Sequence, residues 1–156
     1  MQINKKTLII SIAIPLLVGA LSGFISSGSM AQFGQLNKPP LSPPGFLFPI
    51  VWTILYTLMG IASYLVYTSD TNRAEIREAL TVYAVQLAVN FFWSIFFFNL
   101  EWYLFAFFWL VLLWVLILYT ILLFYKISKP AAYLMIPYLL WVTFAGYLNL
   151  GIYLLN

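Results

Sequence analysis

The chain contains no cysteine and no histidine among its 156 residues, and each absence removes a class of chemistry. Without cysteine there are no disulfides and no thiolate nucleophiles, so the redox compartment of the protein cannot be inferred. Without histidine, Ser-His catalytic triads and His-ligated haem are excluded, and the two absences together exclude zinc sites. We therefore expect no metal site, and any chemistry has to come from the remaining polar and aromatic side chains.

Charge is also scarce, with seven Lys and Arg, four Asp and Glu, and only 7% charged residues in total. Soluble domains average about 25% charged residues. Here 64% of the residues are hydrophobic and 20% are aromatic, which indicates an integral membrane protein. The four acids, Asp70, Glu75, Glu78 and Glu101, fall in loops or at helix ends. An ion-coupled carrier normally needs an ionisable group inside the membrane, so that class is disfavoured.

Five apolar stretches divide nearly the whole chain, and each is long enough to cross a bilayer, which takes about 20 residues. They predict spanning helices at about 7–26, 46–67, 79–98, 103–125 and 131–155. The strict alternation of a transmembrane barrel is missing from these runs. The sequence therefore predicts an all-α bundle of five transmembrane helices that forms one membrane domain over residues 1–156.

The first apolar stretch has a second interpretation, because Lys5 and Lys6 before an apolar run that ends in small residues also resemble a signal peptide. The run is long for a cleaved segment. It also carries Gly19 and Gly23 in a GxxxG spacing, which lets helix backbones approach closely. We treat it as a spanning helix and keep the signal peptide as the alternative.

The loops differ strongly in Lys and Arg content, which predicts an orientation. One side holds six cations: Lys5, Lys6, Arg73, Arg77, Lys126 and Lys129. The other side holds only Lys38. By the positive-inside rule, the N-terminus is expected in the cytoplasm. The net charge of +3 is thus explained by basic residues at one membrane surface. These residues form no concentrated basic patch of the kind that binds nucleic acid.

The connection over about 27–45 is long for a compact bundle. It contains four prolines, Pro39, Pro40, Pro43 and Pro44. Proline stiffens a loop into extended segments, so we interpret this one as an ordered lid, with a simple surface connection as the alternative. Lys38 is the only cation on that face and is suited to pair with a ligand carboxylate.

Three of the expected helices carry a marked polar and aromatic face. At 100° per residue, one face of 79–98 spans about 60° and holds Gln86, Asn90, Trp93 and Phe97. A face of about 100° on 131–155 holds Tyr138, Trp141, Ala145, Leu148 and Asn149. Trp52 and Tyr56 lie one turn apart on 46–67. Aromatic walls with a few amides are typical of an apolar ligand pocket with sparse orienting groups.

The same residues have ordinary structural uses. Aromatics at helical spacing often pack in a core or lie in the interfacial belt, which is our interpretation of Trp102, Trp109 and Trp114. Likewise, Asn90 and Asn149 can serve as hydrogen bonds between helices. Spacing alone leaves pocket and packing both open.

Taken in order, the motifs resemble the TspO/MBR family, the tryptophan-rich sensory proteins of bacteria and the translocator proteins of animals. The resemblance covers essentially the whole chain. It is carried by Lys38-Pro39, Ser42-Pro43-Pro44, Val51-Trp52-Thr53-Ile54-Leu55-Tyr56 with Met59-Gly60, Gln86 to Asn90 with Trp93, and Pro137-Tyr138-Leu139-Leu140-Trp141 with Leu148-Asn149. Each string alone is weak, whereas all of them in order inside five spans are specific.

The resemblance implies a five-helix bundle, usually a homodimer, with a pocket under the first loop. It implies binding of tetrapyrroles such as protoporphyrin IX and of PK11195-type benzodiazepine-site drugs, with no covalent cofactor. For bacterial members it also implies light- and oxygen-dependent breakdown of the porphyrin. With the residue patterns above, the expected ligand-binding residues are Lys38, Pro43, Pro44, Trp52, Tyr56, Gln86, Asn90, Trp93, Trp141, Ala145 and Leu148. Trp52 and Trp141 are the expected photochemical residues.

Several points stay open in the sequence. A metal-free porphyrin needs only flat walls and donors for its propionates, so missing His and Cys are no obstacle. The alternative function is a transporter or stress sensor for tetrapyrroles without catalysis, and a packing subunit without ligand is a third. The animal sterol motif lacks its basic residue here, because nothing basic follows Lys129. Ala84 and Ala88 have a small-xxx-small spacing that suits either a dimer contact or packing within the bundle. The outer surface of the bundle is expected to contact membrane lipid.

Overall fold

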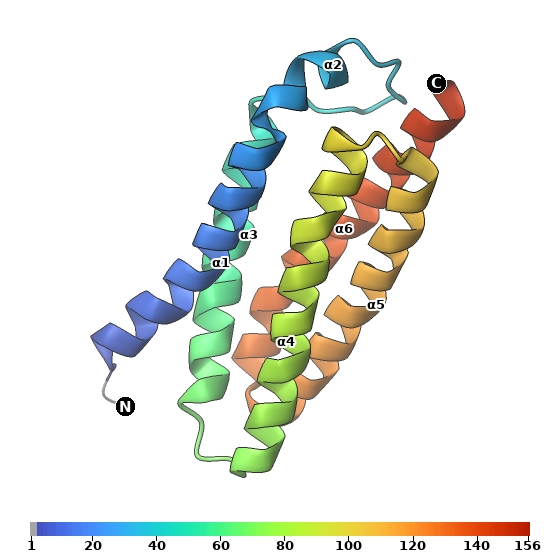
Figure 1. The fold of residues 1–156 in the computed structure, drawn as a ribbon. Helices are drawn as coiled ribbons and strands as arrows, with labels where there is room; N and C mark the ends of the chain where they lie inside the picture. Colours follow the sequence, from blue (N-terminus) through green and yellow to red (C-terminus); the bar gives the residue numbers. More distant parts are fainter. Residues whose placement is uncertain (1–2) are drawn as a thin grey trace.

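The computed structural model describes residues 3–156, and all the regular structure in that range is helical (Figure 1). The long helices are α1 (Lys5–Ser26), α3 (Leu47–Tyr67), α4 (Arg73–Ser94), α5 (Tyr103–Ile127) and α6 (Lys129–Leu155). A 3₁₀ turn (Ser27–Ser29) and the short α2 (Met30–Gly34) follow α1, and a π-helical turn (Ile95–Asn99) continues α4. Five helical segments are long and apolar enough to cross a membrane, as the sequence predicts.

Four of the long helices agree with the predicted ranges to within about two residues, which is the usual uncertainty of helix ends. The third long helix, α4, begins at Arg73 rather than at 79. Hydropathy misses this first part because it is polar, but its start has a clear cause. The side chain of Asn72 accepts a 2.7 Å hydrogen bond from the Ala74 backbone N–H, which caps the helix. The short α2 lies where the sequence predicted only a loop.

The helices form a bundle in which α6, the last in the chain, packs between α3 and α5. Going round the bundle, the extensive contacts are α1 with α3, α3 with α6, α6 with α5 and α5 with α4, and α4 closes on α1 and α3. The α1–α3 connection, the α4–α5 link and the C-terminus lie at one end, which we call the loop end (Figure 1). The opposite end, which we call the charged end, carries the start of α1, the α3–α4 link and the α5–α6 link.

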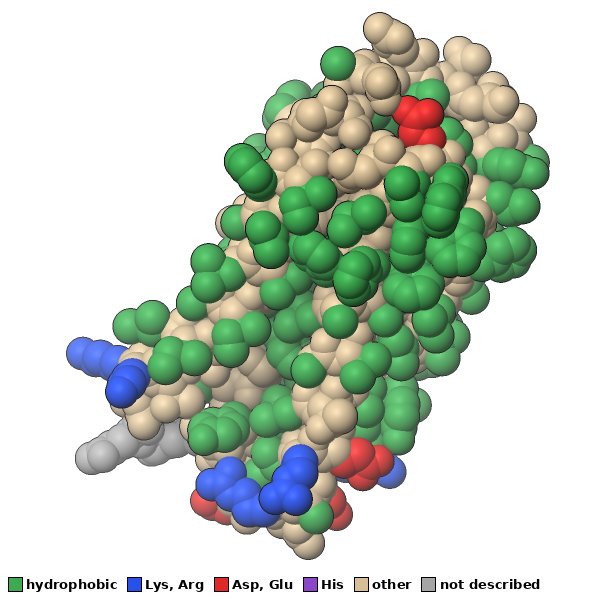
Figure 2. Space-filling model, in the orientation of Figure 1, with side chains coloured by type: hydrophobic (Ala, Val, Ile, Leu, Met, Phe, Trp, Pro, Cys, Tyr) green, Lys and Arg blue, Asp and Glu red, His purple; other side chains and the backbone are tan. Residues whose placement is uncertain are grey.

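Side chains are distributed as expected for a bundle that faces lipid. The interior is filled by buried apolar residues such as Met59, Leu113, Ile117, Phe124 and Met135. Many large apolar side chains are nevertheless exposed, and hydrophobic groups cover the middle of the face in Figure 2. The visible Lys and Arg side chains gather toward the charged end, as a transmembrane bundle requires.

Glycines permit the closest helix crossing. A Cβ on Gly60 of α3 would lie 2.4 Å from the Ile12 Cα and 2.7 Å from the Ser11 carbonyl oxygen of α1. On α1, a Cβ on Gly19 would fall against the ring of Tyr56, whereas one on Gly23 meets nothing within 4 Å. Of the GxxxG pair, only Gly19 therefore makes a close approach within the bundle.

We predict that Gly60→Ala destabilises the fold by about 1–3 kcal/mol, the usual cost of overpacking, because the added methyl meets α1 backbone that cannot rotate away. Thermal unfolding of the detergent-solubilised protein measures the effect. Gly23→Ala is the matched control, since its methyl enters open space. Equal melting temperatures for the two variants would contradict the close α1–α3 crossing.

Candidate ligand-binding site

Four buried polar side chains form a hydrogen-bonded chain across the middle of the bundle. The Tyr56 hydroxyl of α3 donates to Asn90 Oδ1 of α4 (3.2 Å), and Asn90 Nδ2 donates to the Tyr138 hydroxyl of α6 (2.6 Å). Tyr138 in turn donates to Gln86 Oε1 (2.7 Å). We call these four residues the amide–phenol network. It ties three helices together at a depth where water is absent.

The network leaves its amides little free capacity. Tyr138 and Gln86 are fully buried, and Gln86 Nε2 lies 3.9 Å from the Met59 sulfur. A second amide, Asn149 of α6, accepts from Trp93 Nε1 (3.0 Å) and donates to the Tyr103 carbonyl (2.8 Å). Asn90 and Asn149 thus both form hydrogen bonds that link neighbouring helices. A ligand bound beside these amides would either use the hydrogen-bonding capacity that Asn90 has left or displace a tyrosine hydroxyl from Asn90.

Aromatic side chains from α3 and α6 line one side of this network. Trp52 stacks on Tyr56 with ring centroids 5.4 Å apart and meets the edge of Tyr138 at 6.1 Å. Trp141 contacts Phe48 at 6.0 Å, and Phe48 lies one turn before Trp52 on α3. Both indoles are only half-buried. Two partly accessible indoles on neighbouring helices therefore stand beside a buried polar floor.

The short helix α2 places an aromatic cover over the loop end. Its Phe33 contacts Phe48 (6.5 Å), Phe97 (5.9 Å) and Phe98 (5.2 Å). Phe97 and Phe98 belong to the π-helical turn after α4, and such turns often occur at functional sites. The Lys38 ammonium lies 4.8 Å from the centre of the Phe33 ring. Lys38 is therefore in the cover, at the loop end, rather than among the indoles.

The connection is fastened to the last turns of α6. Asn156 Oδ1 accepts from the Asn37 N–H (3.1 Å), and Asn156 Nδ2 donates to the Asn37 carbonyl (2.9 Å). The Tyr147 hydroxyl donates to the Pro40 carbonyl (2.7 Å). Pro39 sits against Gly151, where an added Cβ would lie 2.6 Å from Pro39 Cγ. We call these contacts the C-terminal clasp.

The other predicted site residues are spread around this centre. Trp93 stacks on Phe97 at 5.1 Å, Ala145 packs against the main core, and Leu148 is buried. Pro43 and Pro44 stand in the connection just before α3, where the Pro44 carbonyl accepts from the Leu47 N–H. The structure thus brings Trp52, Tyr56, Gln86 and Asn90 together and leaves the prolines and Lys38 in the connection.

Sequence reasoning missed Phe33, Phe48, Tyr147 and Asn156. The i−4 spacing of Phe48 from Trp52 was a readable signal, whereas nothing local marks Phe33 or Asn156 as partners of distant residues. The tryptophans assigned to packing differ in environment. Trp109 Nε1 donates to the Val89 carbonyl (2.7 Å), Trp114 Nε1 donates to Thr143 (2.8 Å), and Trp102 is exposed.

Fold and site together define a multi-pass helical membrane protein with an aromatic, amide-bearing site under a covered end of its bundle. The family model described as TspO/MBR family matches residues 11–155. The chain therefore belongs to the TspO/MBR family.

Named relatives agree with this membership along most of their length. The chain is 41% identical to "Tryptophan-rich protein TspO" of Chlorobaculum tepidum, over 98% of this chain and 99% of the relative. It is 35% identical to "Tryptophan-rich sensory protein" of Cereibacter sphaeroides, over 80% and 76% of the two chains. It is 34% identical to "Translocator protein" of Bos taurus, over 85% and 82%.

We predict that Asn156→Ala combined with Tyr147→Phe loosens the connection, because three hydrogen bonds of the clasp are lost. Hydrogen exchange of residues 35–42 measures the opening, and a loss of about 1–3 kcal/mol raises the exchange rate by about fivefold to 150-fold. Tyr153→Phe, on the same exposed end of α6, is the matched control. An unchanged exchange rate in the double variant would show that other contacts hold the connection.

Proposed function

We propose that the protein binds a flat tetrapyrrole of the protoporphyrin IX type beside Trp52 and Trp141, with PK11195-type ligands competing for the same space. The observation that carries the proposal is the pairing of two half-buried indoles from α3 and α6 with a buried polar floor. Indoles and phenyl rings stack on flat aromatic ligands with modest but specific gains in free energy. Family membership supports the same ligand class.

In this proposal the α1–α3 connection is a lid. Phe33 is its inner face, Lys38 offers a cation for a propionate at the loop end, and the C-terminal clasp holds it shut. Pro43 and Pro44 stiffen the segment that enters α3. Ligand entry then requires the clasp to open, and Ala145 and Leu148 contribute apolar wall on α6.

The proposed reaction is light-dependent oxidation of the bound porphyrin. One electron passes from Trp52 or Trp141 to the excited porphyrin, which leaves an indole radical cation and a porphyrin radical anion. Dioxygen takes the electron from the porphyrin radical anion and becomes superoxide. The macrocycle then gives one electron back to the indole radical cation, which restores the tryptophan, and the resulting porphyrin radical cation combines with superoxide, so that the net reaction is addition of dioxygen to the macrocycle. The closed lid controls how much oxygen and water reach the site.

The second candidate is transport or sensing of tetrapyrroles without turnover. Two relatives are named as a sensory protein and as a translocator protein, and a lid fastened by discrete hydrogen bonds suits a switch. Both candidates begin with the same binding step. The proposal also includes a cytoplasmic N-terminus, a bacterial plasma membrane and a homodimer, for which exposed Ala84 and Ala88 on α4 offer a close-packing surface.

The binding test is a dark titration of the full chain in lipid nanodiscs with protoporphyrin IX, followed by quenching of tryptophan fluorescence. We expect saturable quenching that PK11195 reverses, and roughly threefold to tenfold weaker binding for Trp52→Ala because one stacking wall is lost. Trp102→Ala is the matched control, because Trp102 is exposed just before α5 and outside the site. Quenching that never saturates, or equal losses in both variants, would refute a porphyrin site here.

The photochemical step is tested by illuminating the porphyrin complex of a Trp52→Phe, Trp141→Phe double variant. Phenylalanine keeps a flat wall but is much harder to oxidise than an indole, so binding should persist while light-driven porphyrin loss falls to the rate of free porphyrin. Trp102→Phe should behave like the unmodified protein. If the double variant still degrades its porphyrin at the original rate, the indoles are not electron donors, whereas the binding proposal is untouched.

A further inference from the structure

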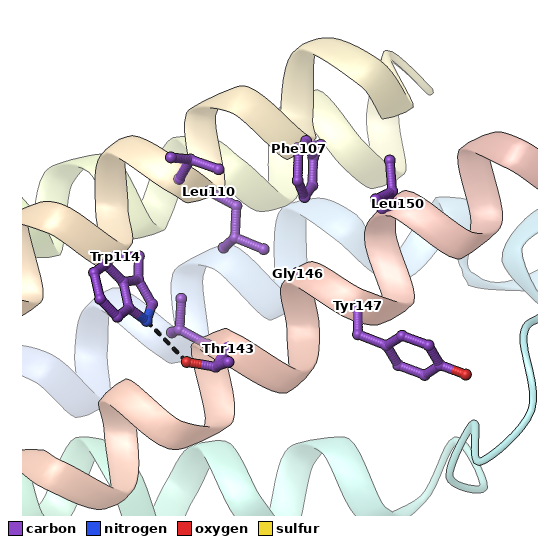
Figure 3. Close-up of a pocket in the computed structure, with 9 residues that line it drawn as sticks. Phe107, Leu110, Trp114, Thr143, Gly146, Tyr147 and Leu150 are labelled. Carbon is purple, nitrogen blue, oxygen red and sulfur yellow. Dashed lines mark hydrogen bonds between the residues drawn. The ribbon is translucent and has the colours of Figure 1, made fainter.

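A hollow lies on the outer surface of the bundle, along the seam between α5 and α6 (Figure 3). It is a groove of about 270 Å³ with an almost entirely apolar lining. Leu110 and Val142 are buried at its floor, and Phe107, Gly146 and Leu150 form part of its walls. Gly146 has no side chain to fill the groove. The space beside it is free, because an added Cβ would meet no atom closer than 3.9 Å.

A more polar hollow of about 470 Å³ continues the seam at the loop end. Its lining includes Glu101 and Trp102 just before α5, Tyr103 at the start of α5, Tyr153 near the end of α6, and Asn156 after it. The residues that line it directly precede those of the apolar groove on α5 and follow them on α6. The two hollows therefore follow one another along the same seam, and we call them together the trough; the hollow at the loop end offers more polar groups than the one toward the middle of the bundle.

The polar end carries one charge and two free donors. Glu101 is the only acid at the loop end of the described chain, since Asp70, Glu75 and Glu78 lie near the charged end. Its backbone is left-handed at φ 56°, a conformation that costs a non-glycine residue about 1–2 kcal/mol. Within residues 3–156, neither Trp102 Nε1 nor the Tyr153 hydroxyl has a protein acceptor, and both side chains are exposed.

We propose that this trough is a binding site for one phospholipid with a primary-amine head group. The ammonium group pairs with the Glu101 carboxylate, the phosphate or ester oxygens accept from Trp102 Nε1 and Tyr153, and one acyl chain lies in the apolar groove. A quaternary amine has no N–H to donate to the carboxylate, and an anionic head group is repelled by it. The site thus selects the head group at one end and accepts any chain at the other.

The lipid site shares Tyr147 and Asn156 with the C-terminal clasp, but it is separate from the indoles and the amide–phenol network of the proposed tetrapyrrole site. The trough opens on the α5–α6 seam, whereas Trp52 and its partners lie where α3 meets α6. Buried Leu110 and Val142 form the floor of the groove on the side of the core. The inference therefore does not depend on porphyrin binding and stands if that proposal fails.

The test is native mass spectrometry of the full chain with equal amounts of phosphatidylethanolamine, phosphatidylcholine and phosphatidylglycerol. We expect one retained phosphatidylethanolamine, preferred at least about threefold over the other lipids, as an interfacial ion pair allows. In Glu101→Gln the preference for phosphatidylethanolamine should vanish, phosphatidylcholine should bind as before, and phosphatidylglycerol should bind more because the repelling carboxylate is gone. The control Glu75→Gln removes a carboxylate at the charged end and should keep the preference.

The acyl-chain groove is tested separately with Gly146→Leu, whose side chain fills the hollow without meeting backbone. This variant should retain severalfold less of each of the three phospholipids, because the groove holds the acyl chain and not the head group. Gly23→Leu, which also adds a leucine to an open helix surface, should leave retention unchanged. Equal retention in Gly146→Leu and the unmodified chain, or an ethanolamine preference that survives Glu101→Gln, would overturn the proposed site.

Discussion

The fold depends on one requirement, which is that polar groups carried into hydrocarbon must find partners inside the protein. Gln86 and Asn90 on α4 meet this requirement through the phenols of Tyr56 and Tyr138, so the last helix of the chain is held against α3 and α4. Asn149 of α6 meets the same requirement by accepting from Trp93 of α4 and donating to the Tyr103 carbonyl of α5. Apolar packing alone gives little preference for one helix order in lipid, whereas these bonds favour the order in which α6 lies between α3 and α5.

The candidate site follows from the same bonds. Because the phenols are fixed by amides, their rings form a rigid edge on which Trp52 stacks, and Trp141 stands on the adjoining helix. The cover of the site is less deeply held. It rests on aromatic contacts of Phe33 and on hydrogen bonds to exposed residues at the end of α6, which is where low local stability is expected. A rigid floor and a releasable cover are a suitable combination for a protein that takes up a large flat ligand.

Much of this arrangement was predictable from the sequence, and the reasons for the exceptions are physical. Apolar runs gave the five helices, and helical spacing correctly placed Gln86 and Asn90 toward the interior. The polar first turns of α4 escaped a hydropathy criterion, although Asn72 is a recognisable cap. Helix α2 and the clasp could not be predicted, because Phe33 and Asn156 acquire their roles only from partners far away in the chain. The spacing of residues in the sequence likewise could not show that Asn90 already makes two hydrogen bonds with tyrosine hydroxyls.

A double-mutant cycle on Asn90→Leu and Tyr138→Phe tests the central role of the amide–phenol network most directly. The free energy of unfolding is measured in a bilayer-like medium for the native chain, both single variants and the combination. We predict that the two changes are not additive and that the coupling is about 1 kcal/mol, within the range known for hydrogen bonds between membrane helices. Additive losses would show that the bond between Asn90 and Tyr138 contributes nothing, and the account of how α6 is held in place would be wrong.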